Sequence, residues 1–366
     1  MKLECSKEKL KHFISLAEKI TVKNSTLPIL DSVLLIAENK VLKIRSTNLD
    51  IGIEFELPVV SIEKEGKIAI PGSIINNILT SLPQEKTVLL NTVNNNLELS
   101  TKNNSTVIKS KETEDFPTIP KIEDGDSFKI DSKKFTSGIK SVLFSSSTSD
   151  IKPEISSVYI YYDGNTLIFT ATDSFRLAEK KVQYKNLDNL NGVIIPFKNA
   201  HEIIRVFDDV DDSVDIKFNK NQISLHCNNI YLTSRLVNGI FPDYKQIIPK
   251  DSLTEVVVLK QDLVNALKMV NIFTDKFNKV NFILNSKNNI FELNSKNDSG
   301  ENKTNITAAI TGDDINICFN SKYIIDCFQS INDDSILLQF NGDNKPVVIK
   351  GVNDGSFLYL IMPINK

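Results

Sequence analysis

Histidines, cysteines and clustered carboxylates are the side chains with which this chain could perform acid–base, nucleophilic or metal chemistry. The three histidines are His12, His201 and His226, and none stands at metal-ligand spacing from another histidine or cysteine. His12 and His201 fall on the polar faces of expected helices, and His226 lies in a strand-like run. The spacing therefore favours surface or hydrogen-bonded histidines over catalytic ones.

The densest acidic cluster is the run 208–212, which reads Asp-Asp-Val-Asp-Asp. Such a run could bind a divalent metal and support a nuclease. It falls between an expected helix and an expected strand, so a solvated turn is the favoured interpretation. A nuclease stays open as an alternative, which Mg²⁺-dependent cleavage lost on mutating Asp208 and Asp209 would support. The sequence has no Walker or dinucleotide-binding glycine loop, so we expect a non-enzyme without cofactor or metal.

The four cysteines are scattered through the chain and contain no Cys-x-x-Cys pair. No apolar run approaches the ~20 residues needed to cross a bilayer. The first residues also lack the apolar stretch of a signal peptide. These observations predict a cytoplasmic protein with reduced, packed thiols and no membrane association.

One pattern runs through the chain three times without linkers. A short apolar run followed by an amphipathic helix begins at Ile70, Ile195 and Phe319, at offsets of 125 and 124 residues. A second marker, Phe-Pro, recurs at the same spacing, at Phe116 and Phe241. A fixed period of this length indicates repeated domains and is too long for a solenoid. The predicted domains are 1–125, 126–252 and 253–366.

Each third contains two expected helices separated by short alternating segments. Apolar residues at helical spacing predict helices over 7–20, 73–82, 132–143, 197–207, 260–271 and 321–331. Between them lie strand-like alternations such as 41–45, 165–170 and 336–340, bounded by turn signals such as Asp163-Gly164-Asn165. The pattern predicts an α+β fold with two helices per domain on antiparallel sheet.

Positive charge is concentrated on these helices. They hold 12 Lys or Arg against 5 Asp or Glu, a balance of +7, so the remainder carries −10 to give the net charge of −3. If the six helices share one face, that face can follow a phosphate backbone without reading bases. Ordinary solvated lysines are the alternative interpretation, which holds for any single residue.

Four segments together carry a family resemblance. They are Thr26-Leu27-Pro28-Ile29-Leu30, Thr172-Asp173-Ser174-Phe175-Arg176-Leu177-Ala178, Gly239-Ile240-Phe241-Pro242-Asp243-Tyr244 and Tyr359-Leu360-Ile361-Met362-Pro363. In this order on a triplicated chain, they resemble the bacterial sliding clamps, the beta subunits of DNA polymerase III, over the whole length.

The resemblance implies a processivity factor without chemistry of its own. It would close into a six-domain ring as a head-to-tail homodimer and encircle duplex DNA without sequence specificity. The implied partners are the DNA polymerase III alpha subunit, the clamp loader delta subunit, and other polymerases and repair proteins with clamp-binding motifs. A paralogous, non-replicative DNA-associated ring is the second interpretation.

The resemblance also implies three sets of site residues. A hydrophobic groove for partner peptides would use Ile155, Thr172, Ser174, Phe175, Arg176, Leu177, Pro242, Ile247, Asn320, Tyr323, Pro346, Leu360, Ile361, Met362, Pro363 and Ile364, with Arg176 giving polar contacts and the aliphatics receiving Leu and Phe anchors. The DNA-facing set is Lys11, Lys23, Asn24, Lys133, Lys140, Lys152, Lys198, Arg205, Lys268 and Lys322. The dimer interface would bring Ile108 near Ile272 and Phe273.

The chain departs from the family pattern at the groove rim and the pore. Phe175 stands where His or Tyr is common, and Gln246 replaces an expected Arg. Asn24 stands where some relatives carry Arg, and the pair 153–154 is Pro-Glu where a Tyr pair contacts DNA.

Overall fold

The structure, a computed structural model, describes residues 1–83, 85–149, 151–185 and 192–364. It divides into two compact units. The first unit comprises Met1–Phe135 and His201–Leu236, and the second comprises Thr136–Ala200 and Val237–Lys366. The chain passes between the units inside its central third, so each unit is described by itself.

Six α-helices are present in the described residues, and all fall where the apolar spacing predicts them. They are α1 (Lys7–Ile20), α2 (Gly72–Ser81), α3 (Ser132–Leu143), α4 (Phe197–Phe207), α5 (Lys260–Val270) and α6 (Ser321–Asp326). The bounds of α1, α3 and α4 agree with the prediction, and α2 and α5 differ by one residue at their ends. The last predicted helix is shorter, because α6 gives way to a 3₁₀ turn over Cys327–Ser330.

The first helix illustrates why these segments are helical. The hydroxyl of Ser6 caps the helix by accepting a hydrogen bond from the backbone N–H of Lys9 at 3.5 Å. Leu10, Ile14 and Ala17 form a fully buried stripe at helical spacing. Burying each large aliphatic side chain contributes about 1.5–3 kcal/mol, which anchors α1 against its sheet.

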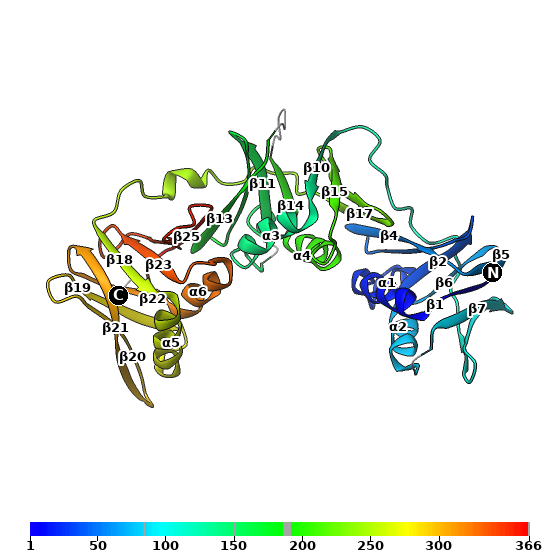
Figure 1. The fold of residues 1–366 in the computed structure, drawn as a ribbon, viewed down its shortest axis with the longest axis horizontal. Helices are drawn as coiled ribbons and strands as arrows, with labels where there is room; N and C mark the ends of the chain where they lie inside the picture. The colour runs from blue at the N-terminus through cyan, green and yellow to red at the C-terminus, as the bar shows by residue number, and fades with distance from the viewer. Residues whose placement is uncertain (84, 150, 186–191, 365–366) are drawn as a thin grey trace. The chain divides into compact units, whose positions relative to one another are not determined.

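The first unit contains two antiparallel sheets. The five-stranded sheet has the order β5 (Ser61–Lys64), β1 (Lys2–Ser6), β7 (Thr87–Val93), β8 (Asn96–Ser100) and β9 (Ser105–Ile108). The eight-stranded sheet has the order β10 (Asp126–Asp131), β15 (Ser213–Phe218), β16 (Gln222–Cys227), β17 (Ile230–Arg235), β4 (Ile51–Pro58), β3 (Val41–Thr47), β2 (Ser32–Glu38) and β6 (Gly66–Pro71). In this second sheet, β17 from the central third pairs with β4 from the first, with Leu232 opposite Ile53 (Figure 1).

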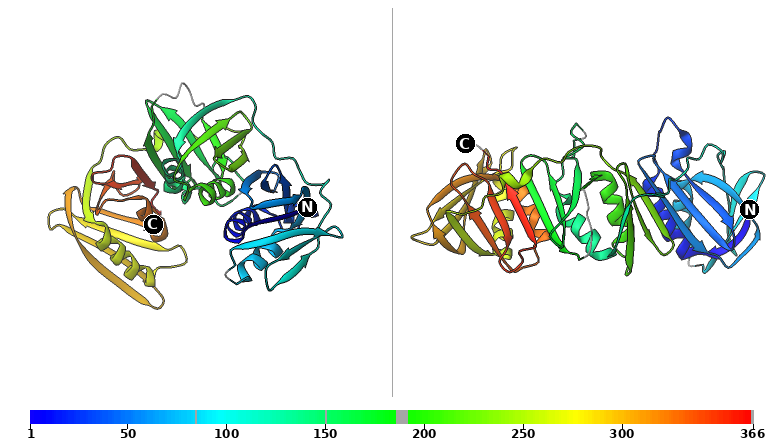
Figure 2. Two further views of the ribbon diagram at one scale, coloured as in Figure 1. Left: turned by 45° about the vertical axis from the view of Figure 1, so that its right-hand side comes forward. Right: turned by 90° about the horizontal axis from the view of Figure 1, so that it is seen from above.

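The second unit contains one twelve-stranded sheet. Its order is β14 (Val193–Pro196), β11 (Ser157–Asp163), β12 (Thr166–Thr172), β13 (Arg176–Gln183), β25 (Phe357–Ile361), β24 (Val347–Gly351), β23 (Ser335–Phe340), β18 (Thr254–Leu259), β21 (Gly300–Gly312), β20 (Ile290–Asn297), β19 (Lys279–Asn285) and β22 (Ile315–Asn320). Here β13 from the central third pairs with β25 from the last, so both sheets continue across the repeat boundaries (Figures 1 and 2).

The predicted turn between β11 and β12 is present. Gly164 and Asn165 have φ values of 54° and 66°. Two successive left-handed residues suit a tight hairpin, and glycine and asparagine are the residues that adopt this conformation at least cost.

The cysteines pack in the interior as expected. Cys5, Cys227, Cys318 and Cys327 are buried, and none of them is in a disulfide bond. Burial raises the pKa of the Cys5 thiol to about 12, so this sulfur stays protonated and unreactive at neutral pH. Within the part of the chain that the structure describes, no helix is long and apolar enough to cross a membrane.

Candidate functional site

The pair β13–β25 has two different faces. Leu177 lies opposite Leu360 in the ladder, and both side chains are fully buried. They pack with Val348 of β24 and with Phe241 and Tyr244 of the following chain segment. This segment, residues 237–248 and here called the linker, therefore covers the inner part of one face of the sheet, the Leu177 face.

A buried polar cluster fixes the linker to the sheet. The hydroxyl of Tyr244 donates a hydrogen bond to the carboxylate of Glu179 and lies 2.7 Å from the hydroxyl of Tyr161. Glu179 and Tyr244 are each only 5% exposed. Burial, followed by the neighbouring Glu179 charge, raises the pKa of Tyr244, which keeps the phenol protonated as donor.

A surface ion pair and ring stacking hold the same segment. Nζ of Lys245 lies 3.1 Å from Oδ2 of Asp163 and 5.3 Å from the centre of the Tyr161 ring. The ring of Phe241 stacks on that of Tyr159 at 4.8 Å between centroids. Pro242 and Ile247 are exposed neighbours of these anchored residues in the linker. Their backbone is therefore held in place beside the sheet.

The turn from β12 to β13 borders the same face. Ser174 has a φ of 77°, and its N–H donates to the hydroxyl of Thr172 at 3.2 Å. Oδ1 of Asp173 accepts hydrogen bonds from the N–H groups of Phe175 and Arg176 at 2.9 and 3.0 Å. The N–H of Met362 donates to the carbonyl of Phe175 at 2.8 Å, which extends the β13–β25 ladder by one residue.

Arg176 is occupied by contacts within the chain. Its guanidinium pairs with Asp326 and, at 2.9 Å, with Asp173, and it lies 4.3 Å from the centre of the Tyr323 ring. Burial lowers the pKa of Arg176, but the hydroxyl of Tyr359 and the carboxylates of Asp326 and Asp173 outweigh it and raise the pKa. Only 12% of the side chain is exposed. In this arrangement Arg176 positions α6 against the turn, and its expected contact with a peptide stays a prediction.

The sixteen predicted groove residues differ in accessibility. The exposed residues are Ser174, Phe175, Pro242, Ile247 and Met362. The half-buried residues are Ile155, Arg176, Asn320, Tyr323, Pro363 and Ile364. The buried residues are Thr172, Leu177, Pro346, Leu360 and Ile361. The ladder places Phe175, Leu177, Leu360 and Met362 on one face. Arg176 and Ile361 alternate with them and point to the opposite face. Beyond β25, the N–H of Ile364 donates to the carbonyl of Cys318 at 2.8 Å, which lays the tail along β22.

Sequence reasoning missed the residues that support this surface. Tyr161, Glu179 and Asp326 were not singled out, although each contacts a predicted groove segment through its side chain. The Phe-Pro-Asp-Tyr motif contained Tyr244, but its partner Glu179 is 65 residues away. The local sequence around either residue gives no sign that the two side chains are in contact.

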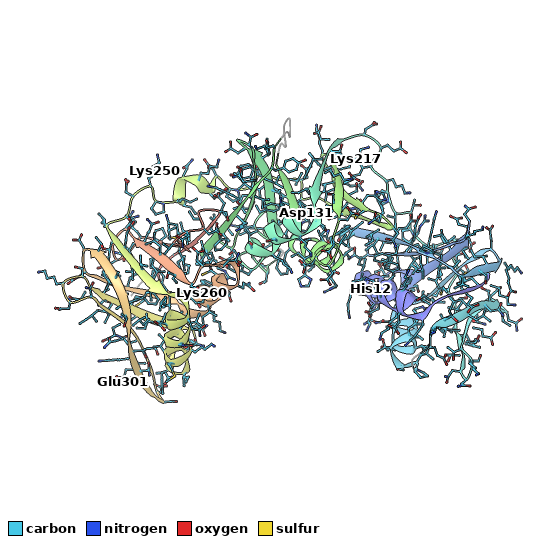
Figure 3. All side chains as sticks on the ribbon, viewed as in Figure 1. His12, Asp131, Lys217, Lys250, Lys260 and Glu301 are labelled. Atoms are coloured by element: carbon cyan, nitrogen blue, oxygen red, sulfur yellow. The ribbon has the colours of Figure 1, made fainter. Side chains whose placement is uncertain are left out.

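The predicted DNA-facing residues all lie on helices or in adjoining loops. The half-buried members are Lys11 and Arg205. The exposed members are Lys23, Asn24, Lys133, Lys140, Lys152, Lys198, Lys268 and Lys322. Carboxylates lie beside members of this set, since Arg205 pairs with Glu202 at 2.5 Å and Lys133 pairs with Asp211. His201 Nδ1 lies 3.3 Å from the Arg205 guanidinium, and His12 projects from α1 (Figure 3).

The acidic run contributes to a turn after α4. The carbonyl of Asp212 accepts a hydrogen bond from Ser132 N–H at 3.0 Å, and its carboxylate accepts from Ser213 N–H and from the Asn228 amide. Among the described residues, no group of three or more His, Cys, Asp or Glu could hold a metal ion. The contacts of Asp211 and Asp212 are those of a turn.

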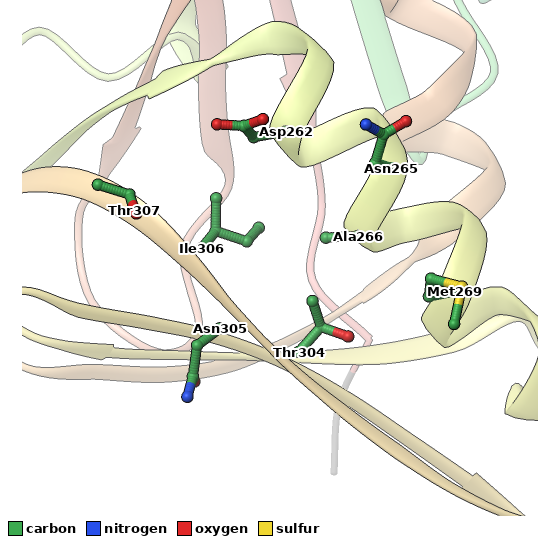
Figure 4. Close-up of a pocket in the computed structure, with 8 residues that line it drawn as sticks. All are labelled: Asp262, Asn265, Ala266, Met269, Thr304, Asn305, Ile306 and Thr307. Atoms are coloured by element: carbon green, nitrogen blue, oxygen red, sulfur yellow. The ribbon is translucent and has the colours of Figure 1, made fainter.

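Two of the strand edges matter for assembly. β9 is an end strand of its sheet, and residues 300–307 of β21 pair with β20 on one side only. Beside the β21 edge lies a pocket of about 320 Å³ between this strand and α5 (Figure 4), whose lining includes Met269 and Ile306. Glu301 lies near the start of this edge (Figure 3).

The residues of the predicted interface differ in exposure. Ile108 is 2% exposed, whereas the neighbouring Val107 is 60% exposed. Ile272 is 64% exposed, and Phe273 is half-buried against Gly300. Val107 is therefore the apolar side chain that β9 can offer to a partner.

Comparison with known proteins assigns the family. Models of the DNA polymerase III beta subunit match the N-terminal domain at residues 1–120, the central domain at 129–243 and the C-terminal domain at 245–365. The beta sliding clamp of Staphylococcus epidermidis is 29% identical over 350 residues, which are 93% of each chain.

Solved structures agree along the full length. The DNA polymerase III beta subunit of Thermotoga maritima has a TM-score of 0.94 at 27% identity, and the DNA polymerase sliding clamp of Bacillus subtilis has 0.94 at 26%. Each alignment covers 100% of this chain and 99% of the other. With three tandem clamp domains of α+β architecture, the chain belongs to the DNA polymerase III beta subunit family.

Proposed function

We propose that this chain encircles duplex DNA and keeps DNA polymerase III on its template. It is a beta sliding clamp, a non-catalytic processivity factor, and the observation that carries this assignment is the family match in all three thirds of the chain. Tethering raises the effective concentration of a polymerase at the primer end without any chemistry by the tether. We place the domain boundaries at 1–125, 126–252 and 253–366.

A head-to-tail homodimer is the proposed assembly. An open β9 edge in the first unit and an open β21 edge in the second can pair between two copies, because each edge carries unsatisfied backbone groups. Val107 on the first edge would then meet Ile272, Phe273 and the pocket beside α5 on the second. Two such contacts would close a ring of six domains.

The exposed helix cations would face the DNA. Lys140, Lys198, Lys268 and Lys322 lie on four different helices, which suits many weak, mobile phosphate contacts. A protein retained by encirclement can slide because no single contact has to be strong. Arg205 contributes less than Lys268 in this proposal, because Glu202 already pairs with Arg205.

Partner proteins would dock on the Leu177 face. Its open end carries Phe175, Met362 and, from the linker, Ile247, and a peptide with apolar anchors could cover them. The proposed partners are the DNA polymerase III alpha subunit, the clamp loader delta subunit, and other polymerases and repair proteins with clamp-binding motifs.

Release from DNA before and after linearisation tests the central proposal. The clamp is loaded onto a nicked plasmid and isolated at moderate salt, and one half of the sample is cut at a single site. We expect slow release from the circle and fast release from the linear product, because an end removes topological retention but leaves phosphate contacts unchanged. Equally fast release from both would contradict encirclement.

A further inference from the structure

We propose that Phe175 makes the groove select partner segments that carry an aromatic side chain beside their apolar anchors. This inference rests on the proposed docking of peptides on the Leu177 face. It concerns which peptides bind there, a property that the family match leaves undetermined.

The first observation is an open apolar end on an otherwise buried face. Leu177 and Leu360 are 0% and 1% exposed, whereas Phe175 and Met362, the next opposed pair in the ladder, are 61% and 39% exposed. Opposed residues of an antiparallel pair share a face and lie within side-chain contact distance. Phe175 and Met362 are thus exposed apolar residues at paired positions on the edge of the groove.

The second observation is that the backbone under this ring is fixed. The carboxylate of Asp173 accepts a hydrogen bond from the N–H of Phe175, and the N–H of Met362 donates a hydrogen bond to the carbonyl of Phe175. Ser174 turns the chain just before the ring, with a φ of 77°. A side chain with two rotatable bonds on a fixed backbone loses little conformational entropy when it is covered. The exposed ring is therefore pre-organised for contact.

The third observation concerns charge. The charged groups next to Phe175 in the turn, Asp173 and Arg176, pair with each other, and Arg176 also pairs with Asp326. A phenyl ring offers no hydrogen bond to a polar partner residue. Covering Phe175 with a polar side chain therefore costs desolvation, and covering it with an aromatic ring is favourable.

Three labelled decapeptides that share one Leu and one Phe anchor test the proposal. The first has Gln on both sides of the anchors, the second has Trp before the Leu anchor, and the third has Trp after the Phe anchor. Affinities for the full-length protein are measured by fluorescence anisotropy. We expect at least one Trp peptide to bind about two- to tenfold more tightly than the Gln peptide.

The matched variants are Phe175→Ser and Val60→Ser. Val60 is 66% exposed and belongs to the first unit, whereas the groove residues belong to the second, so its replacement should leave the preference unchanged. Phe175→Ser should abolish the preference and retain binding of the Gln peptide, with Phe175→Leu as a second variant if the first perturbs the circular dichroism spectrum.

Two outcomes would overturn the inference. Equal binding of all three peptides to the unmodified protein, or a Trp preference that survives Phe175→Ser, would refute the inference and leave the docking function intact. Failure of every peptide to bind would instead refute the groove itself, and the inference with it.

Discussion

Tyr244 connects the chemistry of one side chain to the shape of the groove. Its hydroxyl satisfies the carboxylate of Glu179, which is buried and has one further contact, Lys181 at 3.3 Å. Removing the hydroxyl leaves a buried acceptor short of a donor, which costs about 1–3 kcal/mol. The same change releases the linker that carries Pro242 and Ile247.

We therefore expect Tyr244→Phe to lower both the free energy of unfolding, by about 1–3 kcal/mol, and the affinity for a clamp-motif peptide. Adding Glu179→Gln should restore part of each, because a neutral amide is less costly to bury than a carboxylate. Urea denaturation and fluorescence titration measure the two effects. Tyr162→Phe, which removes an exposed hydrogen bond of 3.1 Å to Asn165, is the control. Unchanged peptide affinity in Tyr244→Phe would refute the role of the anchor.

At the scale of elements, the helices could be predicted from sequence and the strand edges only in part. The helices follow from apolar spacing and local caps, as in α1. The orientation of β9 does not follow from the local sequence, because Val107 and Ile108 are both apolar and β-branched. The pairing of Leu97 with Ile108 decides which of the two is buried. Likewise, the ion pair of Arg176 with Asp326 joins residues 150 positions apart. Long-range pairing of this kind leaves no local pattern.

The β21 edge yields a prediction about assembly. Ile272→Glu should produce monomers, because a carboxylate buried in the interface would lack a partner. Val107→Glu should do the same from the opposite edge. Ile240→Glu is the control, since Ile240 is 91% exposed and lies in the linker. Analytical ultracentrifugation at micromolar concentration reports the mass, and a dimer of Ile272→Glu would show that the interface lies elsewhere.

The tail after β25 yields a second prediction at this scale. Ending the chain at Ile361 removes Met362, with its hydrogen bond to Phe175, and Ile364, with its bond to Cys318. We expect loss of peptide binding at unchanged dimer mass, because these residues belong to the groove wall and not to the strand edges. A chain ending at Ile364 is the matched control. Peptide affinity equal to that of the control would rule out this part of the groove.

At the scale of the whole molecule, charge is divided between helices and the remainder of the chain. The helical stretches carry +7 and the rest −10, so a protein of net charge −3 can still attract DNA to its helices. Lys268→Glu and Lys322→Glu, at two exposed helix lysines, should each lower the salt slope of affinity for linear DNA by about one unit. Arg205→Glu should change it less, because Glu202 already compensates this charge.

Retention on circular DNA separates this effect from topology. The same lysine variants should stay on a closed plasmid nearly as long as the unmodified protein, because the ring and not the contact energy holds them. Filter binding across a salt series and release from the plasmid measure the two quantities. If a lysine variant lost retention on the closed plasmid as strongly as it lost affinity for linear DNA, phosphate contacts alone would retain the protein.

The sharing of strands between thirds has a consequence for what can be cut from this chain. β17 is hydrogen-bonded to β4 and β13 to β25, so residues 126–252 taken alone would expose two flat strand edges at once. Unprotected edges of this kind recruit further strands and promote aggregation. The repeat is thus a unit of sequence but not of independent solubility, and a fragment library should divide this protein along its sheets and not along its period.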